Sequence, residues 1–315
     1  MTGLPLAPQD DTLPEAVFET LFGPSDADAP LPCYVLVDAC KINGLPEILE
    51  TSNLAHRCLF QGEALEDLGD VAPWLVALTP NAPFTLQLLT AADPQDPVPW
   101  HMWQTMPGLF LRSPLNIAEL WSHLRRFTRV RADDDSWFFY RFWEPAYGVE
   151  DVLPRAGSDS ILTQWLYPRS SPPLRVIKPF PQDNELRVFM PAQLDETAKN
   201  RQLVVTQSDR DVLADLARLR HDRALQTHLV EIAPVFASQS KDAQWDWLTR
   251  ALNRGEGVGL HKADALRNFV EAALLLGAWP DEDPELQNIL SDHTLHELDK
   301  ARLIRQSAKK RHNRR

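Results

Sequence analysis

The sequence predicts an α+β protein in which a mixed α/β lobe with a small sheet is followed by an all-helical lobe. Short apolar runs typical of strands alternate with amphipathic helical segments through about residue 190. Beyond about residue 193 the strand signals stop, and apolar residues recur at three- and four-residue steps. With 315 residues, 44% of them apolar and 24% charged, the chain is long enough for about two domains with separate cores. The predicted divisions are a partly ordered leader over 1–30, an α/β domain over 31–192, a helical domain over 193–299 and a basic tail over 300–315.

The elements of the first lobe follow from its apolar runs and their flanking turn residues. One short amphipathic helix is predicted within residues 13–23 of the Pro- and Asp-rich leader. Predicted strands cover 33–39, 72–79, 108–112, 174–178 and 185–190, and predicted helices cover 45–51 and 84–89. Strands and helices thus interleave, as in a layered domain built around a sheet.

Residues 107–145 predict a strand, a helix and a hairpin in succession. Asn116 is an N-cap residue followed three positions later by Glu119, which is a variant of the capping box. The predicted apolar stripe of this helix is Ile117, Leu120, Trp121, Leu124 and Phe127, while His123 and its charged neighbours are expected on the solvent side. The acidic run 133–135 is expected to form the turn between strands at 129–131 and 137–143.

Strand alternation in the second strand of this hairpin would place Phe139, Arg141 and Trp143 on one face. An arginine among aromatic side chains needs a carboxylate or carbonyl partner. Arg141 is therefore expected to be a structural anchor before it is a partner contact.

The second lobe is predicted to consist of helices separated by Gly and Pro. Leucines at three- and four-residue steps run from 213 to 229 until Pro234, and Trp245, Leu248 and Leu252 form the next stripe. A further helix around 266–274 ends at Gly277, and a last helix begins after an N-cap at either Asp283 or Ser291.

Charge is divided unevenly along the chain. The net charge is −12, but the last sixteen residues hold eight Lys or Arg and no acid, which leaves −20 on residues 1–299. An acidic body repels phosphates, so no specific nucleic-acid partner is expected, although weak binding through the tail stays open as an alternative. The simpler interpretation of the tail is a solvated, partly frayed helix end followed by disorder.

No transmembrane segment or signal peptide is predicted, because the longest apolar runs are far below the roughly 18 residues that a span requires. A cytoplasmic protein without a membrane partner is expected. Cys33, Cys40 and Cys58 lack paired spacing and are interpreted as small buried residues.

Motifs for catalysis, metals or cofactors are lacking, so a non-enzymatic protein is expected. There is no HExxH or GxSxG pattern, and Asp133, Asp134 and Asp135 are interpreted as a solvated turn rather than a cation site. The glycines at 255–262 favour a helix-to-helix connection, with a nucleotide site as the alternative, because Lys262 follows His261 instead of a Walker glycine. Trp100 and Trp103 are either an exposed aromatic patch for a partner or core residues of a folded-back loop.

The order of several fragments resembles the domain-of-unknown-function family 4123 (DUF4123). These fragments are YVLVDA at 34–39, LFQG at 59–62, APWLV at 72–76, Ser113 with the helix ELWSHLRRF, and the strand FFYRFWEP ending at 145. The positions that match the family pattern are Trp74, His123, Arg125, Arg141, Trp143 and Pro145. Trp143 keeps the aromatic character of its position, where tyrosine is common, and Glu144 keeps the acid where aspartate is common. Asp135-Ser136 stands where a glycine turn is common.

The resemblance implies an adaptor or chaperone of bacterial type VI secretion. Such an adaptor binds a toxic effector protein in the cytoplasm and brings it to the valine-glycine repeat spike protein (VgrG). The exposed aromatic residues expected at such a surface are Trp100 and Trp103. The alternatives are a nucleotide-dependent enzyme using the loop 255–262 and a nucleic-acid binder acting through the tail.

Overall fold

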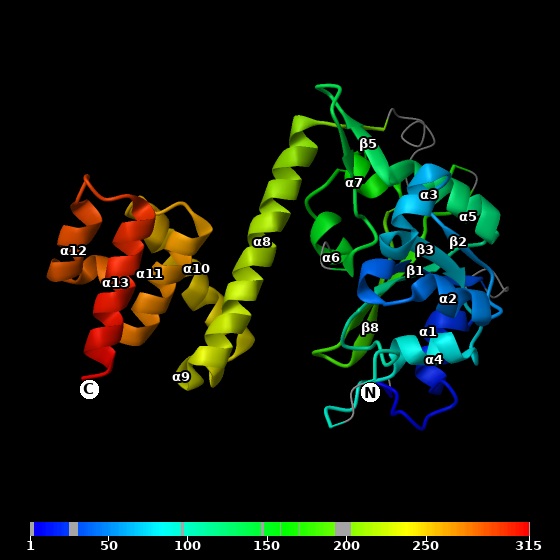
Figure 1. The fold of residues 1–315 in the computed structure, drawn as a ribbon, viewed down its shortest axis with the longest axis horizontal. Helices are drawn as coiled ribbons and strands as arrows, with labels where there is room; N and C mark the ends of the chain where they lie inside the picture. Colours follow the sequence, from blue (N-terminus) through cyan, green and yellow to red (C-terminus); the bar gives the residue numbers. More distant parts are fainter. Residues whose placement is uncertain are drawn as a thin grey trace. The chain divides into compact units, whose positions relative to one another are not determined.

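The computed structural model divides the chain into two compact units, Met1–Leu216 and Ala217–Arg315. It describes residues 3–24, 31–95, 98–145, 148–157, 159–169, 171–192 and 203–314. The division falls inside the long helix α8 (Gln207–Ile232), which belongs to both units (Figure 1). The expected start of the helical domain, residue 193, lies outside the described residues.

A six-stranded antiparallel sheet forms the centre of the first unit, with the strand order β2-β3-β1-β4-β7-β8. Its strands are β1 (Cys33–Asp38), β2 (His56–Cys58), β3 (Pro73–Ala77), β4 (Gly108–Arg112), β7 (Arg175–Phe180) and β8 (Glu185–Phe189). Leu36 in β1 lies opposite both Leu75 and Leu109. Every residue of β1 and β4 is buried, because both faces of the sheet centre are covered.

The two faces of the sheet enclose separate cores. On one face, Val35 and Val37 pack with residues of α1 (Glu15–Phe22), α2 (Leu45–Thr51) and α4 (Pro83–Leu89). On the other face, Tyr34 and Leu36 pack with residues of α5 (Ile117–Leu124), α6 (Val149–Val152) and α7 (Ile161–Gln164). This is the period-two alternation of a strand, which directs successive side chains to opposite layers. Helix α3 (Glu63–Leu68) buries none of its residues.

A second sheet of three strands has the order β6-β5-β9 and consists of β5 (Arg129–Ala132), β6 (Trp137–Phe139) and β9 (Val204–Val205). The hairpin β5–β6 is antiparallel, whereas β9 pairs with β5 in parallel. The predicted hairpin is present, but β6 ends at Phe139, so the prediction of a strand reaching residue 143 was wrong. Phe139 is 59% exposed while Trp143 is 3% exposed, so they do not share one strand face.

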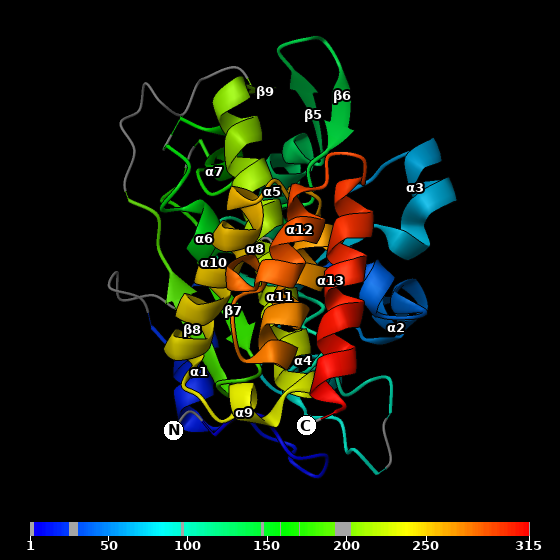
Figure 2. The same cartoon turned by 90° about the vertical axis from the view of Figure 1, so that its left-hand side faces the viewer.

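The second unit contains α9 (Pro234–Ala237), α10 (Lys241–Gly257), α11 (Ala263–Leu276), α12 (Pro284–Ser291) and α13 (Glu297–His312) in addition to the rest of α8. Helices α11 and α13 lie side by side (Figure 2). Ala265 and Ala272 on α11 and Ala301 and Ala308 on α13 are fully buried, and such small side chains let two helices approach closely.

The helix that runs into the basic tail begins after His296, so both predicted starts, Asp283 and Ser291, were wrong for it, although Asp283 is the N-cap of the shorter helix α12. Asp283 caps α12 by accepting hydrogen bonds from the backbone N–H groups of Glu285 and Leu286, and Pro284 holds the first helical position. A separate helix, α13, then begins after His296. Its basic residues up to His312 are helical, and Ile304 and Ala308 are buried in the core.

The fold is therefore α+β, as predicted: a sheet-containing unit precedes a helical one. Short 3-10 turns in the described part of the chain include η1 (Ala39–Lys41), η2 (Gly69–Val71), η3 (Arg125–Phe127) and η6 (Pro280–Glu282). Within the expected leader, Leu6, Val17 and Leu21 are buried in the first core.

Candidate protein-binding surface

The hairpin β5–β6 presents arginine and aromatic side chains on one exposed face. Arg129 pairs with Phe139 across the hairpin, and Arg131 pairs with Trp137. Trp137 is 55% exposed and Phe139 59% exposed, and the Arg129 guanidinium lies 5.0 Å from the Trp137 ring centroid. The alternate residues Val130 and Ala132 are buried against the core. One face therefore anchors the hairpin, and the other leaves large aromatic rings in water.

A second group of arginine and aromatic side chains adjoins the hairpin. The Phe60 ring lies 5.9 Å from the Phe139 ring. Trp121 on α5 lies beneath two guanidinium groups, those of Arg57 at 5.3 Å and Arg125 at 4.9 Å from its ring centroid.

Cys58 connects these two groups. Its carbonyl accepts a hydrogen bond from Trp121 Nε1 at 2.6 Å, and its thiol accepts one from the Phe60 N–H at 3.4 Å. We call the set of seven side chains the arginine–aromatic surface: Arg57, Phe60, Trp121, Arg125, Arg129, Trp137 and Phe139.

Arg141 is an anchor behind this surface. Its Nη2 donates to Asp38 Oδ2 at 2.7 Å, and its Nε lies 3.4 Å from Glu144 Oε2. Asp38 is fully buried at the end of β1, and its other oxygen accepts from the Cys40 N–H. Partial burial lowers the pKa of Arg141, but the hydrogen bond and the charge of Asp38 outweigh it and raise that pKa. The predicted anchor role fits this geometry, although Arg141 lies beyond the strand and its side chain is 42% exposed.

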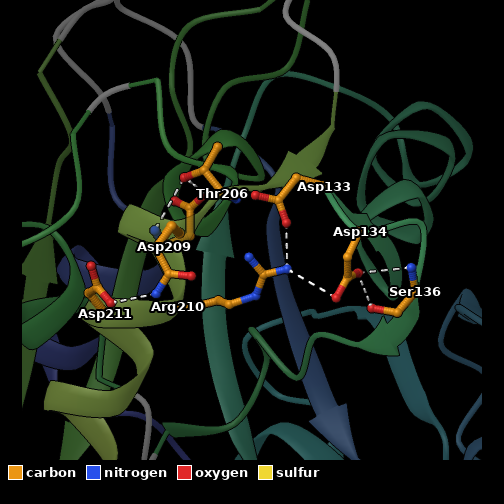
Figure 3. A network of polar contacts seen from close by, with 8 residues as sticks. Asp133, Asp134, Ser136, Thr206, Asp209, Arg210 and Asp211 are labelled. Carbon is orange, nitrogen blue, oxygen red and sulfur yellow. Dashed lines mark hydrogen bonds and ion pairs between the residues drawn. The ribbon is translucent and has the colours of Figure 1, made fainter.

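The tip of the hairpin is tied to the start of α8 through carboxylates. Arg210 Nη2 lies 2.5 Å from Asp133 Oδ1 and 3.6 Å from Asp134 Oδ2 (Figure 3). The Arg210 hydrogen bond lowers the pKa of Asp133, and hydrogen bonds from Ser136 lower that of Asp134, so both carboxylates stay ionised. The acidic run thus forms a turn with guanidinium partners. The described residues include no group of three or more His, Cys, Asp or Glu side chains that could hold a metal ion.

The start of α8 has its own reciprocal cap. The Thr206 N–H donates to Asp209 Oδ2 at 2.8 Å, and the Asp209 N–H donates to Thr206 Oγ1 at 3.3 Å. Asp209, which is 4% exposed, also accepts a hydrogen bond from Ser160. This cap fixes the direction in which Arg210 reaches the hairpin (Figure 3).

Four of the six family-pattern positions lie in or near the core. Trp74 is half-buried and its Nε1 donates to the Gly69 carbonyl at 3.0 Å, whereas Trp143 and Pro145 are buried. His123 is only 8% exposed, so its expected place on the solvent side was wrong. Its Nε2 donates to the Trp165 carbonyl at 2.8 Å, and burial lowers the pKa of His123 to about 4.

The two tryptophans expected as partner contacts have different environments. Trp100 is 48% exposed, as a contact residue requires. Trp103 is 1% exposed and packs with Met102 in the core beneath α4, so its interpretation as an exposed contact was wrong. The backbone explains the difference, because the N–H groups of Met102 and Trp103 donate to the carbonyls of Gln87 and Thr90 and hold that part of the loop inward.

The three cysteines differ in their exposure to solvent. Cys33 and Cys58 are buried as expected, whereas Cys40 is exposed. Burial raises the pKa of the Cys33 thiol to about 12 and that of the Cys58 thiol to about 11, so both stay protonated at neutral pH.

Within the predicted connection 255–262, residues 255–257 form the last turn of α10 and residues 258–262 lead to α11, and two backbone amides of this segment already have an acceptor. The N–H groups of His261 and Lys262 donate to Glu297 Oε2 at 2.6 and 3.0 Å. The carboxylate of Glu297 therefore occupies the anion-binding position at the start of α11. Gly255 packs closely against α11: a Cβ there would lie 2.8 Å from Leu266 Cδ2, so that side chain would have to move.

Parts of the basic tail are also engaged. Arg311 pairs with Asp283 at 2.5 Å and with Glu285, and Arg305 pairs with Glu271. These contacts hold α13 within the helical unit.

Comparison with known proteins found a family model that matches part of the first unit. Residues 33–152 match the model of the family described as Domain of unknown function (DUF4123). This match confirms the resemblance noted in the sequence, and this segment of the chain is a DUF4123 domain. It runs from the first residue of β1 to the last residue of α6, and all seven residues of the arginine–aromatic surface lie within it.

No curated protein and no solved structure matches the chain. Within the described ranges, no helix combines the length and the apolar character that crossing a bilayer would need.

Proposed function

We propose that the protein is a non-enzymatic adaptor that binds a type VI secretion effector in the cytoplasm and loads it onto the VgrG spike protein. The observation that carries this proposal is the arginine–aromatic surface, which lies wholly within the DUF4123 domain. The family resemblance points to type VI secretion, and the exposed side chains of the surface are of the kind that bind a protein partner.

The chemistry of this surface suits protein recognition. Trp and Arg are enriched among residues that dominate binding energies, and rings lose little conformational entropy when a partner covers them. An arginine stacked on an aromatic ring still has N–H donors for carboxylates or carbonyls of a partner. Trp137 and Phe139 offer apolar area that a partner can bury at roughly 25 cal/mol per Å².

The test is co-purification of the tagged full-length protein with the spike and candidate effector encoded beside it, each separately and together. The masses of the products are then measured by mass spectrometry. A stoichiometric complex without turnover supports an adaptor. If neither protein is retained even at low salt, the proposal fails.

Two tryptophan variants locate the contact. We expect Trp137→Ala to weaken partner binding by about 2 kcal/mol, or roughly thirtyfold, because it removes a large, 55% exposed ring from the surface. Trp100→Ala is the matched comparison, since Trp100 is similarly exposed. Equal binding by Trp137→Ala and wild type, with loss in Trp100→Ala, would move the interface to Trp100. Val188→Ala, also at an exposed apolar residue, controls for general effects.

A further inference from the structure

The helical unit contains a cavity of about 840 Å³ that lies outside the DUF4123 domain. Its walls come from the end of α8, from α9, from Trp247 on α10, from the C-terminal part of α11 with the following residues 277–279, and from the C-terminal half of α13. All of these residues belong to the second compact unit. The volume is within the range of natural binding sites, which is about 300–1,000 Å³.

The wall of this cavity is mainly apolar and extends onto the surface. Trp247 and Trp279 stack with their ring centroids 5.7 Å apart and their planes at 22°. At the rim, Ile232 is 49% exposed and Val235 is 79% exposed. A small molecule bound inside the cavity would leave the exposed Val235 side chain in water. An occupant that also buries Val235 must therefore be larger than the cavity and extend over its rim.

The rest of the rim is cationic. Glu271 is 3% exposed, and its carboxylate contacts Arg305, Arg267 Nε at 3.0 Å and His228 Nε2 at 3.1 Å. Burial raises the pKa of Glu271, but the hydrogen bonds from Arg267 and His228 and the charges of the two arginines outweigh burial and lower it, so the carboxylate is ionised. Two guanidinium groups therefore face one carboxylate, and of the two only Arg305 lines the cavity, so excess positive charge remains beside it.

Lys309 adds to this charge one helical turn beyond Arg305 on α13. No ion pair engages Lys309 among the residues that the structure describes. Residues four apart on a helix rise about 6 Å, which is also the spacing of acids at i and i+4 on a second helix.

We propose that this cavity binds an acidic amphipathic helix of a partner protein, with apolar side chains against Trp247 and Trp279 and acidic side chains against Arg305 and Lys309. The proposal rests on the adaptor function and specifies the segment of a partner that the helical unit takes. Insertion of an apolar helix face into a groove between helices is a common mode of peptide recognition. The positive charge at the rim favours a helix that carries acidic side chains over one that carries basic side chains.

The test uses the full-length protein and a fluorescein-labelled synthetic amphipathic helix, with leucines at i, i+3, i+4 and i+7 and glutamates one turn apart beside them. We expect saturable binding by fluorescence anisotropy, weakened at least about tenfold by either Val235→Asp or Lys309→Glu. Both substitutions are at exposed positions, so the fold should be retained. A peptide with lysines in place of the glutamates should bind about tenfold more weakly.

The matched controls are Lys310→Glu, the next residue along α13, and Leu303→Asp, an exposed leucine on the same helix. Neither residue lines the cavity. Equal losses in Lys309→Glu and Lys310→Glu would show unspecific charge attraction and overturn the proposal. Absence of saturable binding would overturn it as well. Binding of dodecanoate with no binding of the peptide would assign the cavity to small amphiphiles instead.

This outcome is separable from that of the adaptor proposal. If effector and spike still co-purify at full yield with the Val235→Asp, Lys309→Glu double variant, the cavity is not the docking site and the adaptor function stands. If wild-type protein retains neither partner, the adaptor function fails whatever the peptide assay gives.

Discussion

Arg141 and Asp38 form an ion pair with 2.7 Å between Nη2 and Oδ2, although they are 103 residues apart in the sequence. The pair joins the end of β1 to the segment that follows β6. It connects the central sheet to the part of the chain that carries the exposed aromatic residues of the hairpin.

We expect Arg141→Ala to lower the free energy of unfolding by about 1–3 kcal/mol, because a fully buried carboxylate loses its charged donor. Denaturant unfolding measures this change. Glu144→Gln is the control: it removes only the weaker contact at 3.4 Å and should cost less than about 1 kcal/mol. Equal losses of unfolding free energy in both variants would show that the ion pair with Asp38 contributes no more to stability than the contact with Glu144.

Arg210→Ala should loosen the hairpin without unfolding the domain. The guanidinium of Arg210 is the link between α8 and the carboxylates of Asp133 and Asp134, and all three groups are at the surface. We expect amide hydrogen exchange in residues 129–139 to become several times faster, as in other locally opened segments. Arg218 lies farther along α8 and forms an exposed ion pair with Glu256 of α10. Arg218→Ala should therefore leave hydrogen exchange in the hairpin unchanged.

His123 should make the protein less stable in mild acid. Its folded-state pKa of about 4 is below the unfolded value near 6.5, so the unfolded state binds the proton first as the pH falls. Stability is therefore lost between about pH 6.5 and pH 4, by up to about 3 kcal/mol.

The measurement is the free energy of unfolding at several pH values in wild type and in His123→Gln, whose amide can still donate to the Trp165 carbonyl. The difference between the two proteins isolates the imidazole from other titrating groups. The same pH slope in both would show that His123 contributes nothing to it.

Nucleotides should not stabilise the protein. The carboxylate of Glu297 accepts the amides of His261 and Lys262 at the start of α11, where a phosphate would have to bind. We expect the same Tm with and without ATP in wild type and in Lys262→Ala. Glu297→Ala should lower the Tm, since it leaves these amides without their acceptor. A Tm increase with ATP that disappears in Lys262→Ala would instead support the nucleotide-dependent alternative.

Elements that depend only on neighbouring residues could be predicted from the sequence alone. Asn116 and Glu119 form the predicted capping box, in which Asn116 Oδ1 accepts from the Glu119 N–H at 3.0 Å and the Glu119 carboxylate accepts from the Asn116 N–H. The strand at 108–112 and the helix at 45–51 have their predicted bounds. Apolar periodicity and capping act over a few residues, so they can be recognised without the fold.

Which side chains face solvent, and which residues they contact, depends on the tertiary structure. Trp121, predicted for the core stripe, does pack against the core, but it is only half-buried and lies beneath the guanidinium groups of Arg57 and Arg125. Arg57 belongs to no recognisable motif. Two features of the sequence could have indicated the arginine–aromatic surface: Phe60, which lies in one of the fragments that resemble the family, and the aromatic run after Asp135. Strands β2 and β9 are too short to be predicted, since pairing partners far away in the chain stabilise them. Burial and long-range pairing depend on the assembled layers, which is why Trp103 and His123 are inside while Trp137 is exposed.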